Sequence, residues 1–330
     1  MKDNSLREIR VVAPSKSWVE KREGDYGRAM MRLRKLGYIV TFGENVRDDS
    51  YLGSAPAKKR AEDLMAAYRD QNVVLIVALD GGWLANAVLP YLDWEVIRQN
   101  PKPLMGYSDI TVLLDAIYAK SGVAAYYGPN LGTLGYQCEA AYTLDCVQKM
   151  LNRRQSISLR PSTAWGVGNG RKRYRTSGWK VLQGGAAEGV ALGGNLGTFY
   201  LLQGTEYMPA FDRPTILCIE DDDEPGKFTL REFDRRFESI LQQPGVRENL
   251  CGLLIGRFCP KSKADMADVQ RMVASKSLGG IPVIADVDFG HTLPMVVLPI
   301  GGRIRVCAAD TPVIEILTDK EGERGDGNTM

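Results

Sequence analysis

The sequence is almost without histidine: among 330 residues, His291 is the single one. Sites that hold a metal through several histidines are therefore excluded, and any mechanism that needs an imidazole must use this residue. Cysteine is also sparse, and no two cysteines form a C-x-x-C pair, which excludes a zinc knuckle or a thioredoxin-like motif. We expect small core residues at all six cysteine positions, namely Cys138, Cys146, Cys218, Cys251, Cys259 and Cys307.

A strong charge of one sign and a long hydrophobic run are missing as well. The 42 Lys and Arg residues against 40 Asp and Glu leave a formal net charge of +2, which gives no support to nucleic-acid or polybasic membrane binding. The longest uninterrupted apolar run, Val73–Leu79, has about a third of the roughly 20 residues that cross a bilayer. Because Met1–Asn4 are polar with no apolar signal core behind them, we expect a cytoplasmic protein without membrane contact.

The sequence does contain alternating strand and helix patterns, which are typical of a parallel sheet with helices on both faces. The length favours two domains. We predict an α/β fold with a parallel-sheet domain over residues 1–160, a linker or substrate loop over 161–178, a smaller mixed α/β domain over 179–318 and a disordered tail over 319–330. The predicted strands are Ile9–Ala13, Tyr38–Phe42, Val73–Leu79, Pro103–Met105, Ala124–Tyr127, Trp179–Val190, Thr215–Ile219, Gly252–Gly256, Pro282–Asp286 and Met295–Ile300. The clearest helices cover Tyr26–Leu36, Ala61–Tyr68, Ala85–Gln99, Ile110–Tyr118 and Leu230–Leu241.

A serine lies where a predicted strand turns into a helix, in Gly106-Tyr107-Ser108-Asp109. Open parallel sheets bind ligands beyond the carboxyl ends of their strands. A serine in such a tight turn has its hydroxyl lifted above the sheet, and the N–H of Asp109 at the helix start is suited to an oxyanion. The turn departs from the hydrolase pattern G-x-S-x-G, because Ile110 replaces the second glycine. The alternative that Ser108 only caps the helix stays open.

Two further ionisable groups directly follow predicted strands. Glu220 ends a buried strand and begins the acidic run Glu220–Glu224, which is a solvated loop or a cation site, although its spacing is not that of a calcium loop. His291 lies in Phe289-Gly290-His291, again just after a strand. A serine, an acid and a histidine are the nucleophile, orienter and base that an activated serine needs. A G-x-G-x-x-G motif does not follow the first strand, so a dinucleotide cofactor is disfavoured.

These motifs together resemble the LD-carboxypeptidase family of serine peptidases. The resemblance is carried by Gly81-Gly82, Gly106-Tyr107-Ser108-Asp109-Ile110-Thr111, Gly193-Gly194-Asn195, Glu220 and Phe289-Gly290-His291, whose order and spacing agree over about Ile9 to Ile316. Within the family, Leu92-Asp93-Trp94, Gln203–Pro209 and Glu220-Asp221-Asp222 are more similar to the microcin C immunity branch than to the muropeptide-recycling carboxypeptidases.

The resemblance implies a Ser-Glu-His triad, with Ser108 as nucleophile, His291 as base and Glu220 as its orienter. It also implies an oxyanion hole made by the backbone N–H groups of Gly82 and Asp109. The implied architecture is a Rossmann-like N-terminal domain with a smaller α/β C-terminal domain, in a homodimer, without metal or organic cofactor. We expect the substrate to contact three more residues: Trp83, Trp165 and Asn195.

The function expected from this resemblance is hydrolysis of microcin C-like aminoacyl or peptidyl nucleotides. Within the loop 161–178, Arg171, Lys172, Arg173 and Arg175 would favour a substrate that carries phosphate. One alternative is an LD-carboxypeptidase that removes the terminal D-residue of muropeptide tetrapeptides. The alternatives of other classes are a two-lobed binding protein for a small ligand and a metal-dependent hydrolase that uses the acidic run. If His291 titrates like an unperturbed imidazole, the acid limb of the rate lies at roughly pH 6–7.5.

Overall fold

The computed structural model describes residues 7–153, 155–170, 172–222 and 224–318. The predicted N-terminal domain 1–160 reaches outside these ranges at residues 1–6 and 154, and three further predictions do so as well. The tail 319–330 lies there entirely, as do Arg171 of the basic loop and Asp223 of the acidic run.

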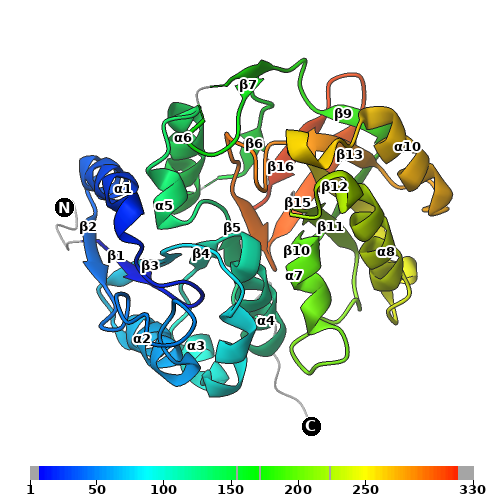
Figure 1. Ribbon diagram of the computed structural model, residues 1–330. Helices are drawn as coiled ribbons and strands as arrows, with labels where there is room; N and C mark the ends of the chain where they lie inside the picture. The colour runs from blue at the N-terminus through cyan, green and yellow to red at the C-terminus, as the bar shows by residue number, and fades with distance from the viewer. Residues whose placement is uncertain (1–6, 154, 171, 223, 319–330) are drawn as a thin grey trace, which may run out of the picture.

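A 14-stranded mixed sheet forms the centre of the molecule (Figure 1). Its main path has the order β2-β1-β3-β4-β5-β14-β10-β11-β12-β13-β9, and β15, β16 and β6 branch from β10. The strands are β1 Glu8–Val12, β2 Ile39–Phe42, β3 Val73–Ala78, β4 Leu104–Gly106, β5 Ala125–Tyr127, β6 Ile157–Leu159, β9 Lys180–Gln183, β10 Gly185–Asn195, β11 Thr215–Glu220, β12 Leu250–Gly256, β13 Val283–Val287, β14 Leu298–Ile300, β15 Arg303–Ala308 and β16 Val313–Ile316.

The sheet has two parallel parts, which confirms the predicted α/β class. Strands β1 to β5 pair in parallel, and so do β10 to β13. An antiparallel pairing of β5 with β14 joins the two parts into one sheet. The parallel strands are apolar along nearly their whole length, as expected for strands covered on both faces, and β3 and β11 are almost completely buried.

Helices flank the strands (Figure 1). In the N-terminal part, α1 and α5 lie on one side of the strands, and α2, α3 and α4 on the other. The helices are α1 Glu23–Lys35, α2 Ala57–Arg69, α3 Trp94–Gln99, α4 Thr111–Ser121, α5 Leu131–Leu134, α6 Ala140–Leu151, α7 Leu196–Phe199, α8 Thr229–Leu241, α9 Val246–Asn249 and α10 Met266–Ser275. Short 3₁₀ helices cover Glu20–Arg22, Ala85–Tyr91, Ser108–Ile110, Tyr200–Leu202, Gly226–Phe228 and Pro260–Ser262. In the described part of the chain, no helix is long and apolar enough to span a membrane.

Two predicted elements are wrong in the same way, because each is divided in the structure. The helix expected over Ala85–Gln99 is a 3₁₀ helix followed by α3. Pro90 has no N–H for a helical bond, and Asp93 starts α3 by accepting a hydrogen bond from the Val96 N–H. The strand expected over Trp179–Val190 is β9 and β10, which pair with different neighbours on either side of Gly184.

The segment 161–178, predicted as an exposed linker or loop, is partly ordered into strands. β7 (Ala164–Trp165) and β8 (Tyr174–Arg175) pair antiparallel, at the top of Figure 1. We call this unit the β7–β8 hairpin. Gly166 and Leu293 exchange two backbone hydrogen bonds of 2.8 and 2.9 Å, so the hairpin is attached to the chain just beyond His291.

Candidate functional site

Ser108 lies at the sharp turn between β4 and α4. Its φ of +62° is in the left-handed region, which costs a non-glycine residue about 1–3 kcal/mol. The Ser108 Oγ lies 3.0 Å from the Nε2 of His291. Among the described residues, no side chain caps the 3₁₀ helix Ser108–Ile110 or α4, so the geometry gives no support to the capping alternative.

The residues on either side of the turn are packed too tightly to rearrange easily. The buried Asp109 carboxylate accepts hydrogen bonds from the Ser15 Oγ at 2.5 Å and from the Ala85 N–H at 2.8 Å. Burial raises the pKa of Asp109, although these hydrogen bonds oppose the rise. A Cβ on Gly81 would lie 3.0 Å from the Ser108 Cβ, so the glycine turn that follows β3 touches the serine. The serine turn is therefore held by two other segments, the one that follows β1 and the one that follows β3.

Glu220 is the last residue of β11 and is 1% exposed. One carboxylate oxygen accepts a hydrogen bond from the Tyr127 hydroxyl at 2.6 Å, and the other lies 2.8 Å from the Nδ1 of His291. Glycine is required at position 290, because a Cβ there would lie 2.3 Å from the carboxylate. A Cβ on Gly256 would lie 2.6 Å from the Glu220 Cβ. Both glycines thus allow the backbone to close around this acid.

His291 links the serine and the acid. Its two ring nitrogens face Ser108 and Glu220, and its side chain is 21% exposed. The three side chains form one continuous hydrogen-bonded row from solvent into the core, contributed by the ends of β4, β11 and β13. The Tyr107 ring, centred 5.2 Å from the imidazole, packs beside it.

The charges of this row are coupled. Burial by itself would lower the pKa of His291, but the Glu220 carboxylate outweighs that effect and raises the pKa to about 9. Burial would likewise raise the pKa of Glu220, but the imidazole and the Tyr127 hydroxyl hold it below its usual range. The sequence-based expectation of an unperturbed imidazole is therefore wrong, because a buried carboxylate stabilises the imidazolium.

The helix that follows Ser108 also holds the strand beside Glu220. The Thr111 Oγ1 accepts a hydrogen bond from the Asn195 N–H at 3.1 Å, and the buried Asp115 accepts one from the Gly193 N–H at 3.0 Å. A Cβ on Gly194 would lie 2.6 Å from the Tyr127 ring, so only a glycine permits this approach. The Gly193-Gly194-Asn195 motif is thus where the two parts of the molecule fit together.

Asn195 is next to Glu220 in the register of β10 and β11. It is buried, and its side-chain oxygen accepts a hydrogen bond from the Thr198 N–H at the start of α7. This contact gives Asn195 a structural role, while substrate contact remains a prediction.

Of the two predicted tryptophans, Trp83 is exposed and Trp165 is half-buried. Trp83 is 71% exposed and borders a hollow of about 350 Å³ beside Gly82. Trp165, in the hairpin, stacks on Tyr174 with ring centroids 4.3 Å apart, and the Arg257 guanidinium lies over its ring at 5.2 Å. Both neighbours thus already contact the Trp165 ring.

A buried charge connects the hairpin with the histidine turn. Asp288, three residues before His291, is completely buried. Its carboxylate accepts hydrogen bonds from the Ser162 N–H and Oγ at 2.8 and 2.7 Å, from the Trp179 Nε1 at 2.9 Å and from the Arg257 Nη1 at 2.8 Å. Each carboxylate oxygen has two donors, so the ion is well solvated by the protein.

Several functional neighbours escaped the sequence reasoning. Tyr127, Ser15, Asp288 and Arg257 lie far from their partners along the chain, and none belongs to a recognisable motif. Only Tyr127 carries a usable signal, since it ends a predicted strand as Glu220 does.

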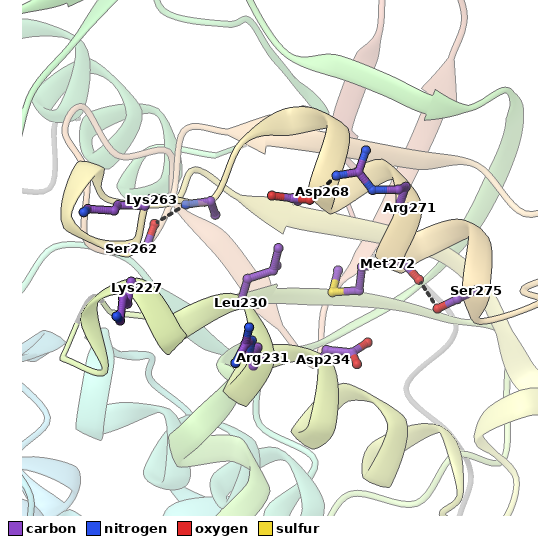
Figure 2. A pocket seen from close by; sticks show the side chains of 11 residues that line it. Lys227, Leu230, Arg231, Asp234, Ser262, Lys263, Asp268, Arg271, Met272 and Ser275 are labelled. Atoms are coloured by element: carbon purple, nitrogen blue, oxygen red, sulfur yellow. Dashed lines mark hydrogen bonds and ion pairs between the residues drawn. The ribbon is translucent and has the colours of Figure 1, made fainter.

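Outside the Ser108–His291–Glu220 row, chemistry could come from metal-binding groups or from a second groove. Among the described residues, no group of three or more His, Cys, Asp or Glu side chains could hold a metal ion. A groove of about 490 Å³ runs between α8 and α10 (Figure 2). Its lining side chains include Lys227, Arg231, Asp234, Lys263, Asp268 and Arg271, all outside the predicted site.

The comparisons with known proteins identify the family of this chain. The description "LD-carboxypeptidase N-terminal domain" matches residues 9–128, and "LD-carboxypeptidase C-terminal domain" matches residues 188–306. The "Putative carboxypeptidase" of Treponema pallidum is 39% identical over 311 residues, which cover 92% of this chain and 90% of that protein.

Solved structures agree as well. The MccF-like protein from Bacillus anthracis superposes with a TM-score of 0.92 at 37% identity, covering 96% of this chain and 98% of that one. The microcin C7 self-immunity protein MccF of Escherichia coli is 29% identical over 84% of both chains. Its structure in complex with glutamyl sulfamoyl guanosine has a TM-score of 0.84 at 26% identity, with 96% and 97% of the chains covered. The chain described here belongs to the LD-carboxypeptidase family.

Proposed function

We propose that this protein is a serine hydrolase that cleaves an amide bond next to a free carboxylate in a small peptide. The observation that carries the proposal is the hydrogen-bonded row, with 3.0 Å between Ser108 and His291 and 2.8 Å between His291 and Glu220. Membership of a carboxypeptidase family supports the reaction class.

In the proposed mechanism, neutral His291 accepts the Ser108 proton while the Oγ attacks the substrate carbonyl carbon. The backbone N–H groups of Gly82 and Asp109 stabilise the negative charge that forms on the carbonyl oxygen. His291 then protonates the leaving amine, and water, activated by the same imidazole, hydrolyses the acyl-enzyme. Glu220 keeps the ring oriented and stabilises the imidazolium, and Tyr127 in turn holds Glu220.

A fluorophosphonate probe tests the nucleophile. We expect mass spectrometry of the labelled, digested protein to place one adduct on Ser108, and Ser108→Ala to abolish it. Unchanged labelling of Ser108→Ala, or no labelling of the wild type, would contradict the proposal. A two-lobed binding protein would give no adduct, and a metal-dependent hydrolase would lose activity in EDTA.

Aminoacyl or peptidyl nucleotides are the second candidate substrates. They are supported by the aromatic pair of Trp165 and Tyr174 in the hairpin and by the structural likeness to MccF, whose solved complexes hold sulfamoyl nucleosides. Because Tyr174 and Arg257 already contact the Trp165 ring, we rank nucleotide substrates below small peptides. Incubation with a murein tetrapeptide and, separately, with an aminoacyl sulfamoyl adenosine compares the two directly.

The homodimer implied by the family resemblance is also a proposal. Sedimentation velocity of the purified protein tests it.

A further inference from the structure

The hollow beside Gly82, which we call the Lys16 pocket, adjoins the serine turn. Ser15, Lys16, Leu52–Ser54 and Gly82–Leu84 line its volume of about 350 Å³. A Cβ on Gly82 would lie 3.3 Å from the Lys16 Cβ, just as one on Gly81 would lie 3.0 Å from the Ser108 Cβ. The side chain of Lys16 therefore starts next to Gly82, the proposed oxyanion donor. The neighbouring Gly81 in turn contacts Ser108.

The walls of the pocket are tied together by buried polar groups. Arg60 is 2% exposed, and its guanidinium donates to the carbonyl oxygens of Pro14 and Leu84, which come from opposite walls. The Ser54 hydroxyl donates to the Ser15 carbonyl, and the Ser17 N–H donates to the Gly53 carbonyl at 3.2 Å. The backbone around Lys16 is thus preorganised, while its side chain is exposed to solvent.

Lys16 begins beside Gly82, and its charge opposes the rise that burial causes in the pKa of Asp80. Lys16 is exposed, and among the described residues no carboxylate forms an ion pair with it. The neighbouring cations are committed: Arg22 pairs with Asp80 below the glycine turn, and Arg60 is occupied by carbonyl groups. An unpaired ammonium group beside an acyl-transfer centre is suited to bind an anionic part of the substrate.

We propose that Lys16 binds the free carboxylate of the residue that leaves, and thereby makes the enzyme select chain ends. This inference rests on the proposed function and deepens it. In a peptide, the terminal carboxylate is separated from the cleaved amide nitrogen by a single carbon. A cation that binds this carboxylate must therefore lie within a few ångströms of the oxyanion donors. The Lys16 side chain begins beside Gly82, so its ammonium group is within reach of that region. The exposed side chains of Leu52 and Trp83 supply an apolar wall for the same residue.

The test compares Lys16→Met with the wild type on a murein tetrapeptide and on the same peptide amidated at its C-terminus. We expect kcat/KM for the free acid to fall about 10- to 100-fold, mainly through KM, because one charge-assisted contact is lost. The amidated peptide should be a poor substrate for both proteins, and its kcat/KM should be the same for Lys16→Met as for the wild type. Lys16→Arg should restore part of the loss, and Lys35→Met, which removes an exposed lysine at the end of α1, should change neither substrate.

Fluorophosphonate labelling separates this inference from the proposed function. Labelling of Ser108 in Lys16→Met at the wild-type rate, with an unchanged melting temperature, would show that the fold and the nucleophile are intact. An equal loss on acid and amide, or no loss on either, would overturn the role of Lys16. A loss confined to an aminoacyl nucleotide with a phosphoramidate linkage would overturn it as well, since the cation would then read phosphate. Absence of labelling in the wild type would instead refute the serine mechanism itself.

Discussion

The Ser108–His291–Glu220 row and the β7–β8 hairpin lie on two sides of one short turn, and they are built in opposite ways. The row is held by buried acceptors and by glycines that leave no room for movement, with Glu220 enclosed by Tyr127, Gly256 and Gly290. The hairpin has only two paired residues in each strand, and apart from its anchor it is made of half-buried and exposed side chains.

The difference between the two regions has a physical reason. Proton transfer between fixed groups requires separations held to a few tenths of an ångström, whereas a substrate-binding segment must admit and release a ligand. Asp288 and Arg257 lie at the boundary. Asp288 precedes the histidine turn and accepts a hydrogen bond from Ser162 at the base of the hairpin, and Arg257 donates to Asp288 and lies over the Trp165 ring. We therefore expect changes in the row to act on kcat and changes in the hairpin to act on KM.

Ser108→Ala should give the largest effect. Removing the nucleophile should reduce kcat by about 10⁴- to 10⁶-fold, and about 10³-fold catalysis over water should remain from binding and the oxyanion donors. Turnover of the murein tetrapeptide, followed by mass spectrometry, measures the loss. Affinity for the substrate should persist, because the hairpin and the Lys16 pocket are unchanged. More than a few per cent residual activity in a pure preparation would contradict the assigned nucleophile.

Glu220→Gln should reduce kcat by about 10²- to 10⁴-fold, because the amide no longer stabilises the imidazolium. It should also shift the pH profile. His291 must be neutral to act as base, so kcat/KM of the wild type should fall on acidification through a pKa raised above 6.5 toward 9.

Without the carboxylate, the acid limb in Glu220→Gln should move to lower pH, since burial alone lowers the pKa of the imidazole. Profiles of kcat/KM against pH for both proteins measure the shift. Because His291 is the single histidine, no other imidazole could account for the limb. The same acid limb in both proteins would contradict the coupling of His291 and Glu220.

Asp288→Asn should break the link between the two regions. It removes the 2.8 Å ion pair of Arg257, which is 3% exposed, and leaves the longer ion pair with Asp286 at 4.0 Å. Loss of one partner from a buried ion pair typically costs about 3–5 kcal/mol, and the amide keeps part of the hydrogen bonding, so we expect about 3 kcal/mol. Urea unfolding measures the change. Asp212→Asn, at an exposed pair with Arg213, is the matched control and should change the free energy of unfolding by less than about 1 kcal/mol.

Trp165→Leu should act mainly on KM. If a nucleobase displaces Tyr174 or Arg257 and stacks on Trp165, KM for an aminoacyl nucleotide should rise about 10-fold, whereas KM for the tetrapeptide should change little. Steady-state kinetics on both substrates decide the matter. A large fall in kcat with an unchanged KM would show that the hairpin belongs to the reaction centre rather than to substrate binding.

The smallest effect is expected from charge reversal in the hairpin, with Lys172→Glu and Arg173→Glu combined. Both cations already have contacts, Lys172 over the Tyr174 ring and Arg173 with the Gly170 carbonyl, so they are only partly available to a phosphate. KM for a nucleotide substrate should rise a few-fold, less at high salt, because exposed charges are screened. Equal changes for a neutral peptide would exclude phosphate recognition by these side chains.

Much of the fold was predictable because the patterns are local. The alternation of buried strands and amphipathic helices located nearly every parallel strand. It did not reveal the interruptions at Pro90 and Gly184, because the apolar pattern continues across both positions. The positions of Ser108, Glu220 and His291 were also readable, since Glu220 directly follows an apolar run and the other two lie within five residues of a predicted strand end. The β7–β8 hairpin could not be predicted, because strands of two residues each are too short to show a periodic pattern.

The sequence by itself determined the α/β architecture, the family, the single imidazole and the three ionisable or nucleophilic groups at strand ends. Only the tertiary structure decided that Ser108 and Glu220, 112 positions apart, are joined through the ring of His291. The same holds for the hydrogen bond from Tyr127 to Glu220 and for the contacts of Tyr174 and Arg257 with the Trp165 ring. It also decided the raised pKa of His291 and the position of Lys16 at the pocket beside Gly82. Periodicity and turn chemistry are properties of neighbouring residues, whereas burial and charge coupling depend on which distant groups the folded chain brings together.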